Sequence, residues 1–108
     1  MKVMVTLTHR TGVASATAEY EGETITVLAG GKINPNFAKH IRGGKNAKAY
    51  RDNPEYVDEN GNIIKKCRFT SPSTAAQFVT GQSMNGYKVW KVEKKVSLGQ
   101  YLKDKGLR

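Results

Sequence analysis

Residues 71 to 81, SPSTAAQFVTG, carry signals for both ends of one helix. Ser71 is a typical N-cap, and Pro72 suits the first helical position because it lacks an N–H that would have no intrahelical partner there. Gly81 suits the left-handed residue that follows a helix. The apolar stripe of this segment is formed by Ala75, Ala76, Phe78 and Val79. The pattern predicts a short helix between Ser71 and Gly81.

Segments rich in β-forming residues flank this helix. They are KVMVTL (2–7), TAEYEG and ETITVLAG (17–30), IIKKCRFT (63–70) and YKVWKV (87–92). Glu21-Gly22 predicts the turn of a hairpin, and alternation places Ile25 and Val27 on its buried face. The same alternation turns Ile63, Cys67 and Phe69 inward.

Two further helices are expected. One begins at Asn34-Pro35 and ends at Gly43-Gly44, with another short turn through Ala47 and Tyr50. A last helix follows the Ser97…Gln100 capping box and closes at Gly106. Residues 1–108 therefore predict one small α+β domain, with an antiparallel or mixed sheet of about four or five strands and about three short helices.

Charge is distributed in blocks. The chain has 18 Lys+Arg against 9 Asp+Glu, a net charge of +9. Residues 24–51 contain basic but no acidic side chains, 52–62 the reverse, and 63–108 are again basic, which predicts separate surface patches. Such a balance favours polyanions, while a solvated basic face is the alternative.

The basic block around Gly43-Gly44 is a candidate phosphate-binding segment, since glycines expose backbone amides and cations neutralise phosphates. Its candidate contacts are Lys39, Arg42, Lys45, Lys48 and Arg51. The alternative is a mobile loop whose lysines serve solubility.

The sequence displays no catalytic constellation. His9 and His40 lack partner motifs, and H-E-x-x-H, C-x-x-C and G-x-S-x-G are absent. Cys67, the single cysteine, allows no internal disulfide and no cysteine-built metal site. It reads as a small buried hydrophobic residue, or alternatively as a thiol activated by Lys66 and Arg68. We expect no enzymatic activity, no cofactor and no metal.

The stretch FTSPSTAAQFVTGQSMNGYKVWKV, followed by SLGQYL, resembles the domain of unknown function 4357 family, whose pattern is F-S-S-P-S-x-A-A, then G, then N-G-W-x-x-W and a Leu-bearing helix. The matching residues are Phe69, Ser71, Pro72, Ser73, Ala75, Ala76, Gly81, Asn85, Gly86, Trp90 and Leu98. The resemblance is strongest over 69–102 and weaker over 14–33. Tyr87 stands where a Trp is usual, and the middle segment is shorter and more basic than expected.

Members of that family often follow GIY-YIG-type nuclease domains, and the motif is similar to the restriction-enzyme adenine-methylase-associated domain. The resemblance thus implies an accessory DNA-binding or DNA-sensing role associated with restriction and modification. Within the motif, Ser71 and Ser73 either cap the helix or also bind phosphate. Asn85 forms a turn or also frames a nucleic-acid-binding groove, in which Lys88 and Lys91 contact phosphates. Trp90 belongs to the core or, beside Lys88 and Lys91, stacks on a base.

The expected function is therefore a non-enzymatic nucleic-acid-binding module, with DNA favoured over RNA. The alternative is a protein-interaction module, encoded by a phage or other mobile element, that docks on a nuclease or methyltransferase. No segment has the length and apolarity of a signal sequence or membrane span, so we expect no membrane association and a cytoplasmic location.

Overall fold

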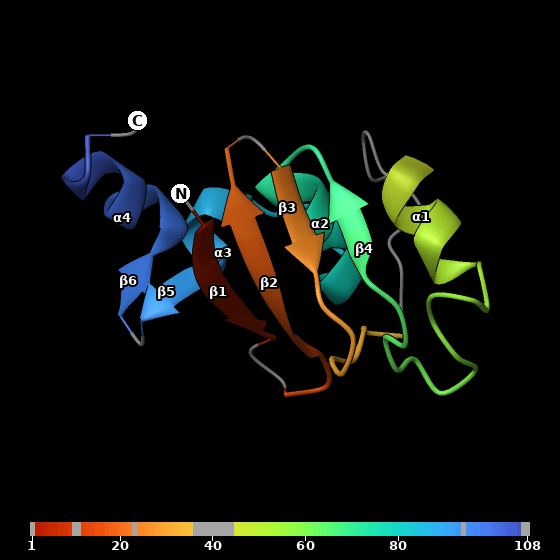
Figure 1. The fold of residues 1–108 in the computed structure, drawn as a ribbon. Helices are drawn as coiled ribbons and strands as arrows, with labels where there is room; N and C mark the ends of the chain where they lie inside the picture. The colour runs from red at the N-terminus through yellow and green to blue at the C-terminus, as the bar shows by residue number, and fades with distance from the viewer. Residues whose placement is uncertain (1, 10–11, 23, 36–44, 94, 107–108) are drawn as a thin grey trace.

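The computed structural model describes residues 2–9, 12–22, 24–35, 45–93 and 95–106. In this part of the chain, six strands form one antiparallel sheet in the order β4-β3-β2-β1-β5-β6, accompanied by four helices (Figure 1). The strands are β1 (Lys2–Thr8), β2 (Ser15–Glu21), β3 (Thr24–Val27), β4 (Cys67–Phe69), β5 (Lys91–Glu93) and β6 (Val96–Ser97). The helices are α1 (Lys45–Arg51), α2 (Pro72–Thr80), α3 (Gly86–Val89) and α4 (Leu98–Asp104). The predicted α+β class is confirmed, with one strand and one helix more than expected.

The first three strands form where the sequence predicts strands, and they lie at the centre of the sheet. β1 pairs with β2 along its whole length, from Lys2 opposite Glu21 to Thr8 opposite Ser15. The β2–β3 hairpin turns at Gly22, whose φ of 62° lies in the left-handed region that favours glycine. Ile25 and Val27 are fully buried, so the alternation predicted for this hairpin is confirmed.

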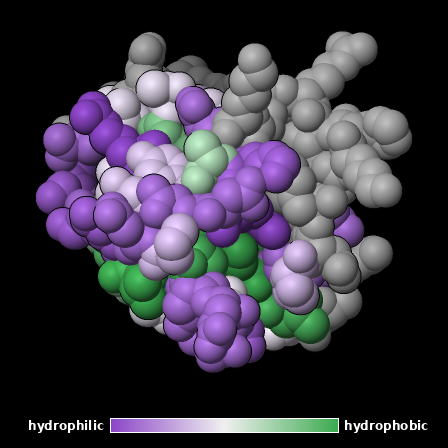
Figure 2. Space-filling view, turned by 90° about the vertical axis from the view of Figure 1, so that its right-hand side faces the viewer, coloured by the Kyte–Doolittle hydropathy of each residue, from purple (hydrophilic) through white to green (hydrophobic). Residues whose placement is uncertain are grey.

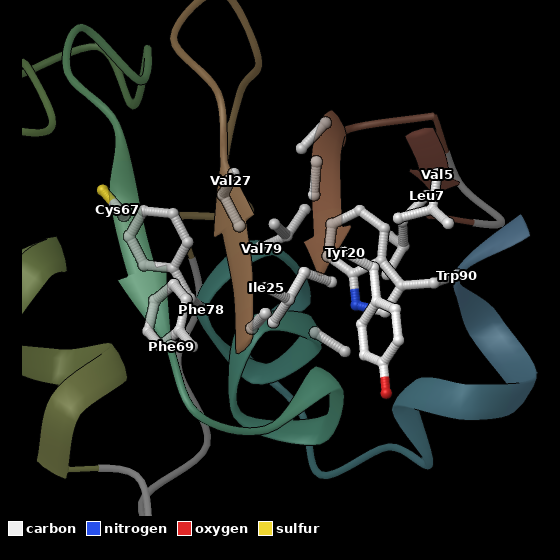
Figure 3. Close-up of a cluster of buried hydrophobic side chains, with 14 of the residues drawn as sticks. Val5, Leu7, Tyr20, Ile25, Val27, Cys67, Phe69, Phe78, Val79 and Trp90 are labelled. Atoms are coloured by element: carbon white, nitrogen blue, oxygen red, sulfur yellow. The ribbon is translucent and has the colours of Figure 1, made fainter. Parts of the chain in front are cut away.

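The helices follow one another along the sheet in chain order, with α1 beside β4 at one end and α4 beside β6 at the other (Figure 1). α1 packs against α2, α2 against α3, and α3 against α4, with α2 and α3 behind the strands in the view of Figure 1. Figure 3 shows the core between the layers, with Phe69 and Phe78 at one end and Trp90 at the other. The chain therefore has two distinct ends, one at β4 and α1 and the other at β6 and α4.

The helix between Ser71 and Gly81 forms where the sequence predicts it. Ser71 is its N-cap, Pro72 its first residue, and Gly81 follows it with a φ of 74°. The predicted stripe is fully buried, at 0% exposure for each of its members, Ala75, Ala76, Phe78 and Val79. Ser97 likewise caps α4, because its Oγ accepts a hydrogen bond from the backbone N–H of Gln100 at 3.2 Å.

Three predicted elements differ. The strand expected over 87–92 is wrong, since Gly86–Val89 forms one helical turn and only Lys91–Glu93 is extended. The strand expected over 63–70 shortens to β4, although Ile63, Cys67 and Phe69 are buried as predicted. The helix expected from Asn34-Pro35 to Gly43-Gly44 falls mainly on residues 36–44, outside the described residues, and the turn through Ala47 and Tyr50 is part of α1.

Candidate nucleic-acid interface

The Ser-Pro-Ser start of α2 holds α3 in place. The Ser71 Oγ accepts hydrogen bonds from the backbone N–H groups of Ser73 and Thr74, at 3.2 and 3.5 Å. The Ser73 Oγ accepts one from the N–H of Gly86 at 3.0 Å. Ser71 therefore caps α2 as predicted, whereas the Ser73 hydroxyl binds α3 and does not cap its own helix.

Gly86 lies directly against the first turn of α2. A Cβ at this position would overlap the backbone of Pro72 and Ser73. The close approach needs glycine because backbone atoms cannot move aside as the end of a flexible side chain does. The Asn-Gly pair of the motif thus has two local roles, since Asn85 caps α3 through an Oδ1 that accepts from the N–H of Tyr87 at 3.0 Å.

Trp90 is a core residue, so its assignment as a nucleic-acid contact is wrong. Its side chain is 0% exposed, and its indole Nε1–H donates to the Pro72 carbonyl oxygen at 3.0 Å. A ring with no exposed surface cannot stack on a base. The core assignment, the other alternative from the sequence, is confirmed. We call the hydrogen bonds from Gly86 and Trp90 to the start of α2 the α2–α3 clamp.

The basic block before residue 52 is less available than its charge suggests. The Lys48 Nζ donates to the Asp52 carboxylate at 2.6 Å. The Arg51 Nε–H donates to the Phe78 carbonyl oxygen at 2.9 Å, which anchors α1 to α2. Burial lowers the pKa of the Arg51 guanidinium to about 10, against the opposing effect of Asp52. Lys39 and Arg42 lie outside the described residues, and Lys45 begins α1.

The basic and acidic blocks also share one surface, so the expectation of separate patches is wrong here. A pocket of about 320 Å³ at the α1 end is lined by Lys48 and Arg51 together with Asp52, Asp58 and Glu59. Figure 2, which faces this end of the molecule, shows a mainly hydrophilic surface with hydrophobic side chains in a band below it. Carboxylates beside the cations reduce the attraction that this end offers to a polyanion.

A second cluster of lysines surrounds α3. A pocket of about 360 Å³ is lined by His9, Met84, Lys88, Val89 and Lys91 among other residues. A second pocket, of about 420 Å³, is lined by Lys88 as well, and its wall also includes Asn85, Tyr87, Gln100 and Lys103. No carboxylate is among the described residues that line either pocket.

We call this region the α3–α4 surface, defined by Asn85, Tyr87, Lys88, Lys91 and Lys103. Lys88 and Lys103 are exposed, and Lys91 is half-buried. Asp104, the acidic residue of α4, accepts a hydrogen bond from the Gln100 side chain at 2.8 Å. Sequence reasoning found Lys88, Lys91 and Asn85 but missed Tyr87 and Lys103. Tyr87 was noted only as a departure from the family motif, and only the packing of α4 against α3 brings Lys103 there.

The described residues also bear on three other features: a reactive thiol, a metal site and a membrane-spanning helix. Cys67 is fully buried, its Sγ donates to the Lys65 carbonyl oxygen at 3.3 Å, and burial raises the pKa of its thiol to about 12. The structural assignment of this cysteine is thus confirmed over the reactive one. Within the described ranges, no three His, Cys, Asp or Glu side chains gather as a metal site would require. None of the described helices combines the length and apolarity needed to cross a bilayer.

Comparison with known proteins yields one match. The family model described as Domain of unknown function (DUF4357) matches residues 7–102, nearly the whole chain and all of the clamp. No curated protein and no solved structure matches significantly. The match extends well beyond the C-terminal motif and includes all of β2 and β3. The chain therefore belongs to the Domain of unknown function (DUF4357) family.

Proposed function

We propose that this protein is a non-enzymatic, nucleic-acid-binding accessory module, with DNA as the favoured partner, acting through the α3–α4 surface. The observation that carries the proposal is the pair of pockets around Lys88. Lysines line both, and no carboxylate stands among their described lining residues. A net charge of +9 adds long-range attraction to the same partner.

The chemistry of these cations favours backbone binding over sequence reading. Lysine ammonium groups act as compact point charges with rotatable donors. The planar guanidinium of arginine, in contrast, forms bidentate hydrogen bonds to guanine. Contacts of this kind supply affinity through released counterions and carry no direct sequence information. The family resemblance implies an accessory role beside a restriction or modification enzyme, and sequence-independent affinity suits such a role. The cytoplasmic location expected from the sequence completes the proposal.

Binding of a fluorescent oligonucleotide, followed by anisotropy over a series of salt concentrations, tests the proposal. We expect binding at low ionic strength, and a slope of log affinity against log salt that decreases by about 0.9 for each duplex phosphate contact removed. The variant K88A/K103A, which removes two exposed lysines, should lose affinity and flatten this slope. The matched control is K65A/K66A, which removes exposed lysines close to β4 in the chain, at the opposite end of the sheet order.

An absence of binding at low ionic strength, to single-stranded and duplex probes alike, would contradict the proposal. Recovery of a nuclease or methyltransferase in a complex that survives nuclease treatment would then favour the protein-interaction alternative. Equal losses in the variant and its control would show that general charge, and not the α3–α4 surface, carries the binding.

A further inference from the structure

The geometry points to a single strand as the form of nucleic acid that the α3–α4 surface prefers. We propose that each pocket beside Lys88 accepts one base and that Lys88 contacts the phosphate linking the two nucleotides. This inference rests on the proposed function and specifies its ligand. It gives a role to the two pockets between the lysines, because phosphate binding by the lysines alone would not use them.

The two pockets are adjacent and of suitable size. Lys88 lines both, so its side chain forms part of the wall between them. Their volumes, about 360 and 420 Å³, fall at the lower end of the range in which proteins hold small molecules, which begins near about 300 Å³. Successive nucleosides in a strand are linked by a phosphate, so two hollows that share one cation suit two bases and the phosphate between them.

The pocket walls combine apolar side chains with cations. Met84 and Val89 are partly buried against the core and line the first pocket, with Lys91 in the same wall. Tyr87 is also partly buried and lines the second pocket together with Lys103. Apolar and aromatic surface beside positive charge is the combination that binds unpaired bases and their backbone without reading sequence.

A duplex would use this surface poorly. Its bases are stacked inside the helix, so they cannot enter the hollows, and reading them requires an element that reaches into a groove. α3 has 4 residues, a rise of about 6 Å. α4 has 7 residues, about two turns. A duplex would therefore contact the lysines and leave both pockets unfilled.

Three probes applied to the wild-type protein separate the possibilities. The first is an oligothymidylate of about ten nucleotides, within the range of single-strand site sizes. The second is an abasic strand of the same length, which keeps the phosphates and lacks the bases. The third is a hairpin duplex with the same number of phosphates. We expect the oligothymidylate to bind about tenfold or more tightly than the abasic strand, and more tightly than the duplex.

The outcomes distinguish this inference from the proposed function. Equal affinity for thymidylate and abasic strands, or tighter binding of the duplex, would overturn the single-strand inference while leaving nucleic-acid binding intact. No binding of any probe would overturn the proposed function itself. Because these measurements use the unaltered protein, they do not depend on a variant that folds.

One variant then tests the pocket directly. Tyr87→Leu removes the aromatic ring and keeps an apolar side chain of moderate size. We expect it to weaken oligothymidylate binding about fivefold or more and to leave abasic-strand binding unchanged, since only the first probe has bases to stack. An equal loss for both probes would show that Tyr87 acts through the fold and would count against its place in a base pocket. The control K65A/K66A should leave the ratio of oligothymidylate affinity to abasic-strand affinity unchanged.

Discussion

The two ends of the helical layer both carry cations, yet they differ in what surrounds those cations. At the α1 end, Lys48 pairs with Asp52, Arg51 bonds to the backbone of α2, and Asp58 and Glu59 line the same pocket. At the α3–α4 end, Lys88 and its neighbours line pockets whose described walls lack carboxylates. Positive charge therefore stabilises the fold at one end and remains available to a partner at the other.

The largest effect should come from breaking the clamp that positions the α3–α4 end. Gly86→Ala places a Cβ into the backbone of Pro72 and Ser73, so α3 must separate from α2. We expect the free energy of unfolding to fall by about 3 kcal/mol or more. Denaturant unfolding measures this directly. In the control Gly99→Ala, the new Cβ would lie 3.2 Å from Tyr87, and stability should change far less; a comparable loss in both would contradict the account of Gly86.

Trp90→Phe tests the other half of the clamp. The smaller ring leaves a cavity in a fully buried site and removes the hydrogen bond to the Pro72 carbonyl oxygen. We expect a loss of about 2–3 kcal/mol in unfolding free energy. Thermal unfolding measures this loss, and an unchanged stability would contradict the part of Trp90 in the clamp.

Substitutions of Arg51 and Lys88 should have opposite effects: the first should lower stability, and the second should lower nucleic-acid affinity. Arg51→Met removes the hydrogen bond to Phe78 and should cost about 1–2 kcal/mol of stability, with nucleic-acid affinity little changed. Lys88→Ala alters an exposed side chain and should change stability by less than about 0.5 kcal/mol while lowering affinity. A loss of affinity in Arg51→Met that matches that of Lys88→Ala would remove the distinction between the two ends.

Cys67 shows that cations next to a residue in the sequence need not act on its side chain. Lys66 and Arg68 are exposed while Cys67 is buried between them, so neighbouring cations in the chain do not activate the thiol. Burial raises its pKa in the folded state to about 12, from 9.0. The thiol ionises more readily in the unfolded chain, so its contribution to the free energy of unfolding is fully present below about pH 9. That contribution is lost as the pH rises from 9 toward 12. A thiol reagent at pH 8 should react slowly with the native protein and rapidly after unfolding; fast native reaction would contradict burial.

The smallest effect is expected at the exposed Lys48–Asp52 pair. Its side chains are 64% and 63% exposed, so Lys48→Ala should cost only about 0.3–0.5 kcal/mol, and less at high salt. Thermal unfolding at low and high ionic strength can measure this difference. A large, salt-independent loss would mean that Lys48 contributes through packing instead of charge.

Sequence reasoning succeeded where signals are local. The caps of α2, the turn at Gly22 and the burial of Ile25 and Val27 depend on residues a few positions apart. The pairing of Lys48 with Asp52 was also accessible, because residues four apart on a helix face each other. Reading residues 24–51 and 52–62 as separate blocks concealed that pair.

The remaining features depend on contacts between distant parts of the chain. Tyr, Val and Trp favour strands, yet residues 86–89 form a helical turn, because Asn85 caps it and hydrogen bonds from Gly86 and Trp90 reach residues 13 and 18 positions earlier. Likewise, nothing in the spacing places Lys103 beside Lys88 until α4 packs against α3. The candidate site was therefore only partly predictable.

The α2–α3 clamp has a consequence for how this family can diversify. Its requirements fall on inward-facing atoms, namely a serine hydroxyl, a carbonyl oxygen, a glycine without Cβ and an indole N–H. Lys88, Lys103 and the other outward-facing side chains take no part in it. The motif that identifies a relative and the residues that choose its ligand are thus separable. A relative can keep the whole motif and present a surface of different charge. Membership of the family therefore specifies the packing of α2 against α3 and leaves the ligand of each member open.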